Sequence, residues 1–139
     1  MGTRDGIEPA QPLPVGVRHH RDLEVWKLAD EVRRQILQLV SRPDVRRDHH
    51  FCDQSSRAAS SACHNIAEGF YRFSPGEFAH FLNIAYGSLG ELLDCMDEAR
   101  HKVYLAAEDF DALDALISRT MAAMRSLRRY LAAPKRPAR

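Results

Sequence analysis

The sequence predicts an all-α protein that folds as an antiparallel, up-down four-helix bundle. Apolar residues recur at spacings of three and four in four separate segments, which is the pattern of helices that bury one face. Residues that start or stop helices lie between these segments, and no segment has the two-residue alternation of a strand. Four helices of roughly 20 residues joined by short loops pack side by side in alternating directions.

The first predicted helix begins after Asp22, a residue type that commonly caps helix N-termini. It ends at Ser41-Arg42-Pro43, because proline cannot donate a backbone hydrogen bond and restricts the residue before it. Trp26, the single tryptophan, is expected in the core or against a neighbouring subunit. The apolar stripe consists of Leu23, Trp26, Ala29, Val32, Ile36 and Leu39.

The second predicted helix begins after Asp48, another N-cap candidate. It is expected to end at Gly69, because glycine readily adopts the left-handed conformation that stops a helix. Small side chains on the inner face let a neighbouring backbone approach closely, so this helix should be the most tightly packed. Its inner face consists of Phe51, Ser55, Ala58, Ala59, Ala62 and Ile66.

The third predicted helix has the clearest start signal. Ser74-Pro75-Gly76-Glu77 places serine at the N-cap, proline at the first helical position and glutamate at the third, which is a capping box. Gly87 and Gly90 lie inside the apolar stripe that follows, and each costs up to ~1 kcal/mol relative to alanine. We therefore expect another helix to cross closely at that level.

The fourth predicted helix begins near Glu108 and ends near Leu131, with acidic residues early and arginines late, as the helix dipole favours. These boundaries divide the 139 residues into three parts. Residues 1–20 are proline-rich and are expected to form a disordered arm, residues 21–132 form the bundle, and residues 133–139 form a basic, disordered tail.

Composition is that of a globular protein, with 45% hydrophobic and 28% charged residues. No stretch approaches the ~20 apolar residues needed to span a bilayer, and residues 1–20 lack the apolar run of a signal peptide. We therefore expect a cytoplasmic protein that does not enter a membrane. Its three cysteines, Cys52, Cys63 and Cys95, are widely spaced and are expected to be reduced, buried or half-buried thiols.

The sequence does not predict an enzyme. It contains no glycine-rich phosphate loop, nucleophile elbow or zinc-protease motif. Glu77 and His80, like Glu98 and His101, have the spacing used by di-iron bundles, but both pairs lie on the third helix, about 31 Å apart at 1.5 Å per residue. We expect no catalytic residue, metal, cofactor or small-molecule substrate.

Charge is unevenly distributed although the net charge is only +1. Residues 125–139 carry six basic side chains and no acidic one, whereas residues 91–114 carry eight acidic side chains against Arg100 and Lys102. This asymmetry is compatible with contact to nucleic acid or with subunits that meet head to tail.

Asn65, Glu68 and Glu91 lie on or beside apolar stripes, where an unpaired polar group costs a few kcal/mol. We expect a structural, hydrogen-bonded network between the second and third helices, to which Arg57 could contribute. Aromatic residues near helix ends are candidates for a subunit interface. These are Phe70, Tyr71, Phe73 and Tyr104, three of which flank Arg72 in a loop that could instead stack on nucleic-acid bases.

Several motifs together resemble one family. They are Asp22-Leu23-Glu24-Val25-Trp26, Asn65-Ile66-Ala67-Glu68-Gly69, and Gly87-Ser88-Leu89 with Glu91. The chain resembles, from about Asp22 to Leu131, the bacterial four helix bundle proteins, also called the 23S ribosomal RNA intervening-sequence proteins. It is also similar to the accessory variability protein of diversity-generating retroelements. It differs from the usual family pattern at Ala62-Cys63, where Ile-Pro is common, and at Phe73, where a second basic residue is common.

The resemblance implies an up-down bundle that assembles into a ring, typically a homopentamer, without enzymatic activity. It also implies a role in binding RNA or DNA. We expect the phosphate contacts to come from Arg57, Arg72, Arg125, Arg128 and Arg129. The alternative is a structural scaffold whose partner is another protein.

Overall fold

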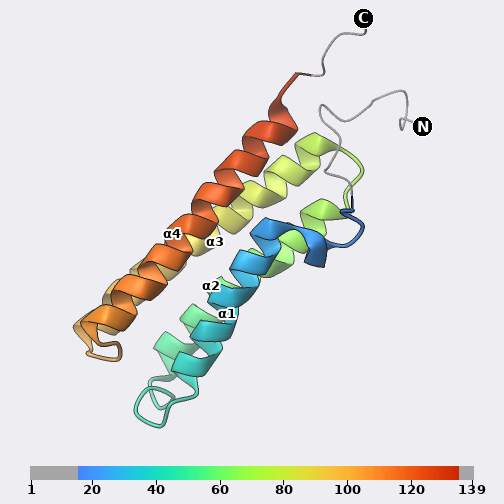
Figure 1. Ribbon diagram of the computed structural model, residues 1–139. Coiled ribbons are helices and arrows are strands. Elements are labelled where there is room, and N and C mark those ends of the chain that lie inside the picture. The colour runs from blue at the N-terminus through green and yellow to red at the C-terminus, as the bar shows by residue number, and fades with distance from the viewer. Residues whose placement is uncertain (1–15, 135–139) are drawn as a thin grey trace, which may run out of the picture.

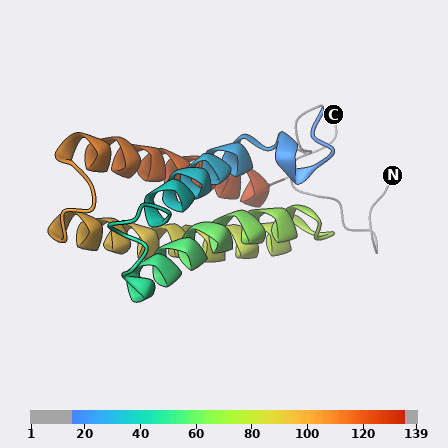
Figure 2. The ribbon, with the colours of Figure 1, turned by 90° about the horizontal axis from the view of Figure 1, so that it is seen from below.

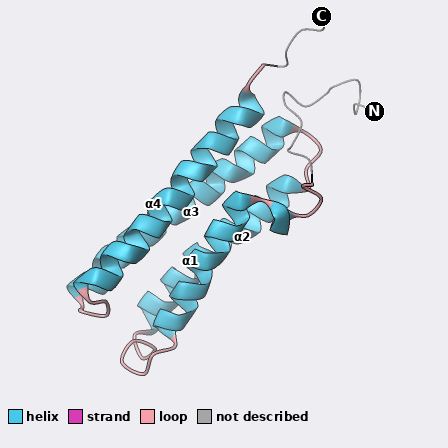
Figure 3. Ribbon diagram, in the orientation of Figure 1, coloured by secondary structure: helices cyan, strands magenta, loops and turns pink. Residues whose placement is uncertain are grey.

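The computed structural model describes residues 16–134 and contains a short 3-10 helix and four α-helices in that range (Figure 1). The 3-10 helix η1 spans His20–Asp22, α1 spans Glu24–Val40, α2 His49–Phe70, α3 Pro75–His101 and α4 Ala107–Ala132. Within these residues there is no strand (Figure 3).

The helices follow one another around the bundle in alternating directions, which confirms the predicted fold (Figures 1 and 2). Each helix packs against the next one in the chain, and α4 packs back against α1. The backbones of two helix pairs do not approach within 8 Å between Cα atoms, α1 with α3 and α2 with α4, so these helices occupy opposite corners of the bundle. The α2–α3 turn and the end of α4 lie at the same end of the bundle as η1, and the other two turns lie at the opposite end.

The most extensive contact is between α2 and α3. On α2, Ala58, Ala59 and Ala62 are buried, and these small side chains let the two helix backbones lie close together, as predicted. The cysteines are also as predicted: Cys63 and Cys95 are buried, Cys52 is half-buried, and all three are free thiols. Burial raises the pKa of the Cys63 thiol to about 11.

The predicted N-caps of α2 and α3 are confirmed. The Asp48 carboxylate accepts a hydrogen bond from the Phe51 backbone N–H at 3.2 Å, and the Ser74 hydroxyl accepts one from the Glu77 N–H at 3.1 Å. Each cap satisfies one of the N–H groups that have no partner in the first turn of a helix.

The predicted N-cap of α1 is wrong. Leu23, not Asp22, precedes α1, and no side chain caps this helix. Asp22 instead closes η1, where its carboxylate accepts hydrogen bonds from the backbone N–H groups of Arg18 and His19 at 2.9 and 3.0 Å. Aspartate side chains also bond to backbone N–H groups outside helix caps, and here the carboxylate is engaged by two N–H groups that precede it in the chain.

The predicted role of Gly69 as a left-handed helix stop is also wrong. Helix α2 continues through Gly69 to Phe70, and Gly69 does not have a positive φ. A Cβ atom at this position would lie 2.8 Å from Phe78 Cδ1 and 2.8 Å from Phe81 Cβ. Glycine is therefore required because α3 passes directly over the last turn of α2.

No described helix of the same subunit crosses α3 closely at Gly87 and Gly90, in contrast to the prediction. A Cβ atom at either position would meet nothing within 4 Å among the described residues. Gly87 is exposed and Gly90 is half-buried, and Ile84, one turn before, is 40% exposed. These glycines therefore lower the helix propensity of α3 without admitting another helix of the same subunit.

Most of the predicted arm, residues 1–15, lies outside the described residues, as do residues 135–139 of the predicted tail. The last residue of that arm, His20, belongs to η1 and contacts the bundle. Its ring packs edge-on against Trp26 and Tyr71, with centroids 5.0 and 5.7 Å apart. Trp26 itself is half-buried against the core.

Candidate nucleic-acid interface

The second half of α4 presents three exposed arginines, Arg125, Arg128 and Arg129. None of them forms an ion pair within residues 16–134. Arg125 Nη1 donates a hydrogen bond to the Tyr86 hydroxyl at 2.7 Å, and Arg129 Nη2 donates one to Ser126 Oγ at 3.4 Å. Their positive charges are therefore not neutralised by carboxylates of the described chain.

The other two candidate arginines are already paired. Arg57 Nε lies 3.2 Å from the Asp53 carboxylate one turn earlier on α2. Arg72 forms an ion pair with Glu68 and lies 4.0 Å from Glu77, and its guanidinium stacks over the Phe81 ring at 4.7 Å. A phosphate would have to displace these carboxylates, so Arg57 and Arg72 are weaker anion contacts than the arginines of α4.

The five arginines do not form one surface on a single subunit. Arg57 lies on α2, at the corner opposite α4. Arg72 lies in the α2–α3 turn, at the end of the bundle where α4 finishes. The structure therefore separates the predicted set into a group of three on α4 and two individual residues.

Two neighbouring helix segments beside these arginines lack acidic residues. Residues 78–90 of α3 and residues 115–132 of α4 contain no aspartate or glutamate. The helices run antiparallel in contact, so both segments lie toward the same end of the bundle. The eight acidic residues of the 91–114 stretch are on the other halves of the same two helices. This segregation gives the α3–α4 pair a basic half and an acidic half.

A hollow of about 140 Å³ lies between α3 and α4 within the basic half. Its walls are Asn83 and Tyr86 from α3 and Arg125 and Arg128 from α4, and Leu82 and Met124 close it from below. The Arg125 guanidinium also lies over the Tyr86 ring, 5.7 Å from its centroid. The geometry thus combines two guanidinium groups, an aromatic ring and a primary amide.

Comparison with protein-family models gives a match to the 23S rRNA-intervening sequence protein family over residues 21–126. The match covers all of α1, α2 and α3 and most of α4. The chain belongs to this family. The resemblance inferred from the sequence motifs is therefore confirmed. The matched region includes Arg125 and ends before Arg128 and Arg129. Comparison with curated proteins gives no match.

In this intervening-sequence protein the predicted polar residues belong to separate contacts. Asn65 Nδ2 donates hydrogen bonds to the Ser61 backbone oxygen at 2.8 Å and to Ser61 Oγ at 3.1 Å. The Ser61 hydroxyl in turn lies 2.8 Å from that of Ser88, so Asn65 belongs to a hydrogen-bonded link between α2 and α3. Glu68 instead pairs with Arg72. Glu91 is exposed on α3.

The four aromatic interface candidates lie at two ends of the bundle. Phe70, Tyr71 and Phe73 are at the α2–α3 turn, where Tyr71 is 55% and Phe73 73% exposed, and Phe70 packs edge-on against Phe78. Tyr104 lies at the opposite end, after α3, and its ring contacts Phe51 with centroids 5.2 Å apart. Only the first three lie close together within one subunit.

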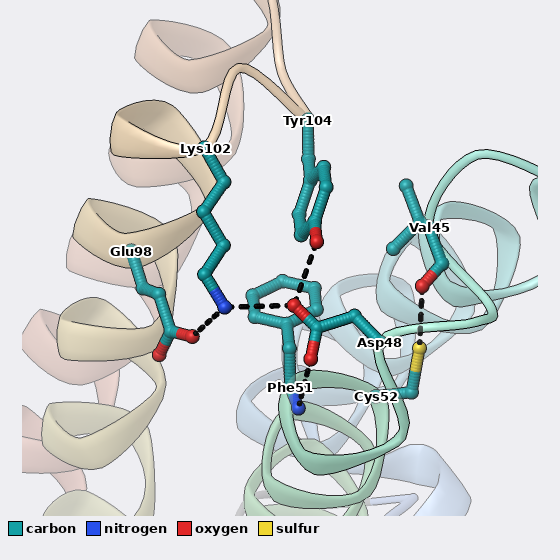
Figure 4. A network of polar contacts seen from close by, with 7 residues as sticks. All are labelled: Val45, Asp48, Phe51, Cys52, Glu98, Lys102 and Tyr104. Atoms are coloured by element: carbon teal, nitrogen blue, oxygen red, sulfur yellow. Dashed lines mark hydrogen bonds and ion pairs between the residues drawn. The ribbon is translucent and has the colours of Figure 1, made fainter.

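Sequence inspection of this family member missed a polar cluster around Asp48 (Figure 4). The Asp48 carboxylate accepts hydrogen bonds from Lys102 Nζ at 2.7 Å and from the Tyr104 hydroxyl at 2.6 Å, in addition to capping α2. These bonds, first that of Lys102, lower the pKa of Asp48 to about 2. Asp48 correspondingly raises the pKa of Lys102, which also pairs with Glu98 at 2.7 Å, and that of Tyr104.

Sequence inspection also missed Asn83 and Tyr86. The signal was present in the absence of acidic residues from positions 78–90, opposite the arginine-rich segment of α4. Among the described residues, no three His, Cys, Asp or Glu side chains gather as metal ligands. Nor does any helix in that range have the length and apolar character required to cross a membrane.

Proposed function

We propose that the protein is a non-enzymatic, ring-forming homo-oligomer that binds nucleic acid through the second half of α4. The observation that carries this proposal is the group of three arginines without ion-pair partners among the described residues, beside two helix segments, residues 78–90 and 115–132, that have no acidic residue. A polyanion approaching these two segments meets no carboxylate belonging to them, and each arginine can contact a phosphate. The name of the family refers to 23S ribosomal RNA, which favours RNA as the first ligand to test.

Oligomer formation is supported by the exposed face of α3. Gly87 and Gly90 have open space where a Cβ would lie, and Ile84 is exposed beside them. A helix of a second copy could approach this face as closely as glycine allows. Tyr71 and Phe73 add exposed aromatic surface at one end of the subunit. By family resemblance, the expected assembly is a pentamer.

The binding test replaces Arg125, Arg128 and Arg129 with glutamine and measures affinity for structured RNA and for duplex DNA over a series of salt concentrations. We expect weaker binding and a shallower salt dependence, with the slope reduced by about 0.9 per lost phosphate contact on a duplex. A matched control replaces Arg21, Arg46 and Arg47, which are also exposed and form no ion pair among residues 16–134. It removes the same charge from other parts of the surface. Equal effects of the two triple variants would contradict an interface on α4.

The assembly test measures the molar mass by analytical ultracentrifugation. Gly87→Leu should dissociate the oligomer, whereas Ser118→Leu, which places the same side chain at an exposed position of α4, should not. A wild-type monomer at micromolar concentration would contradict the proposal. An oligomer that binds neither RNA nor DNA would favour the alternative function, a scaffold for a protein partner.

A further inference from the structure

The hollow between α3 and α4 differs in its charge from two other depressions lined by described residues. The depression between α1 and α4 contains Glu31 and Asp109, and another at the far end of α3 contains Asp94, Asp97 and Glu98. These carboxylates repel phosphate. The hollow beside Arg125 and Arg128 has no acidic side chain in its lining.

The lining also carries groups that a phosphate backbone alone would not use. Asn83 offers an amide that can both donate and accept hydrogen bonds, as the edge of a nucleobase requires. The half-buried Tyr86 ring lines the hollow, and its hydroxyl accepts a hydrogen bond from Arg125, whose guanidinium lies 5.7 Å from the ring centroid. Arg128 stands beside the ring with no ion pair among residues 16–134.

We infer that this hollow binds one unpaired nucleotide of a single-stranded nucleic acid. The base lies against Tyr86 with its edge toward Asn83, and the adjoining phosphate contacts Arg128 and Arg125. A duplex keeps its bases stacked inside and presents mainly phosphates, so it would contact the arginines and leave the hollow empty. Stacking on an aromatic ring accepts any base, and the site is therefore expected to recognise an unpaired strand without a defined sequence.

This inference rests on the proposed interface on α4, and it adds to that interface a preference for unpaired strands. The experiment measures fluorescence anisotropy of labelled oligo-uridine RNA, oligo-thymidine DNA and a mixed-sequence duplex of equal length. Wild-type protein should bind both single strands more tightly than the duplex. Tyr86→Ala should weaken single-strand binding by about tenfold and leave duplex binding and the salt dependence unchanged. Tyr86→Phe, which keeps the ring, should retain most of the single-strand affinity.

Arg128→Gln serves as the contrasting variant, since it should weaken single-strand and duplex binding alike and make the salt dependence shallower. Circular dichroism and ultracentrifugation verify that each variant folds and assembles. If Tyr86→Ala does not fold, Asn83→Ala is measured in its place, because Asn83 is exposed and its side chain can be removed without disturbing the core. This variant should also lose affinity for single strands but not for the duplex.

Two further results would overturn the assignment. If wild type and Tyr86→Ala (or Asn83→Ala, where that variant is used) bind single strands equally tightly, the hollow is not a binding site, even though the arginines of α4 still bind phosphates. Free uridine or adenosine monophosphate that binds as tightly as the strand would assign the hollow to a nucleotide rather than to a nucleic acid. In contrast, a wild-type protein that binds no nucleic acid of any kind would reject the proposed function itself.

Discussion

The Lys102 ammonium lies 2.7 Å from the Asp48 carboxylate and thereby joins the turn after α3 to the residue just before α2. The same carboxylate caps α2 and accepts the Tyr104 hydroxyl. The two turns at this end of the bundle are thus held together by one side chain, although Asp48 and Lys102 are 54 positions apart in the sequence.

Replacing Asp48 separates its two roles. Asp48→Ala removes the helix cap and both contacts to the other turn, and should lower the free energy of unfolding by about 2 kcal/mol. Asp48→Asn keeps an oxygen that can cap α2 and should cost about 1 kcal/mol or less, because a partly exposed ion pair contributes little. Urea denaturation measures both. Equal losses in the two variants would mean that the cap contributes nothing.

The cluster should also make stability depend on pH. Because the pKa of Asp48 is lowered to about 2 in the folded protein, its contribution is present above its ordinary pKa of 3.8 and is lost as the pH falls toward 2. Lys102 and Tyr104 have raised pKa values, so their contribution is lost as the pH rises above their ordinary values of about 10. The stability difference between wild type and Asp48→Asn should therefore be largest between about pH 4 and pH 10. A constant difference from pH 2 to pH 7 would contradict this assignment.

Two glycines of the bundle should respond oppositely to the same substitution. Gly69→Ala places a methyl group 2.8 Å from atoms of Phe78 and Phe81 and should destabilise the subunit by about 1–3 kcal/mol. Gly87→Ala meets nothing within the chain and should stabilise an isolated subunit by up to ~1 kcal/mol through helix propensity. Thermal denaturation compares them. A stabilising Gly69→Ala would show that α3 does not pass closely over α2.

The turn after α3 contains a strained residue. Val103 has a φ of 60°, in the left-handed region that β-branched residues avoid. The Tyr104 N–H donates to the Ala99 carbonyl oxygen at 2.8 Å, which places Val103 at the usual glycine position of a Schellman motif. Val103→Gly should raise the free energy of unfolding by about 1 kcal/mol, and Val103→Ala, which keeps a Cβ, should gain less. Denaturation with guanidinium tests both; a loss of stability in the glycine variant would contradict the strain.

Local features of the sequence predicted the four helices, because the start and end of a helix depend mainly on residues close to it in the chain. Ser74 caps α3 through the backbone of Glu77, three positions away, and Pro43 lies just beyond the end of α1. Prediction failed at Gly69, where the structure depends on contacts between two helices. A glycine near a helix end can stop the helix or admit another one, and only the path of α3 shows that Gly69 does the latter.

The candidate site was predictable in part for the same reason. The run of basic residues on α4 is visible in the sequence, and so is its lack of acidic neighbours. The sequence does not show which arginines form ion pairs, because that depends on which carboxylates lie within reach in the fold. Asp53 pairs with Arg57, and Glu68 pairs with Arg72. The meeting of Tyr86 with Arg125 depends on the register between two antiparallel helices.

The separation of acidic and basic halves along α3 and α4 makes this side of each subunit an electric dipole parallel to the bundle axis. Subunits that stand parallel around a ring axis place like poles beside one another, and their repulsion is relieved when ions screen it. Subunits joined head to tail place opposite poles together, and screening weakens that attraction. Added salt should consequently strengthen assembly in the first arrangement and weaken it in the second. In both arrangements it should weaken the binding of nucleic acid.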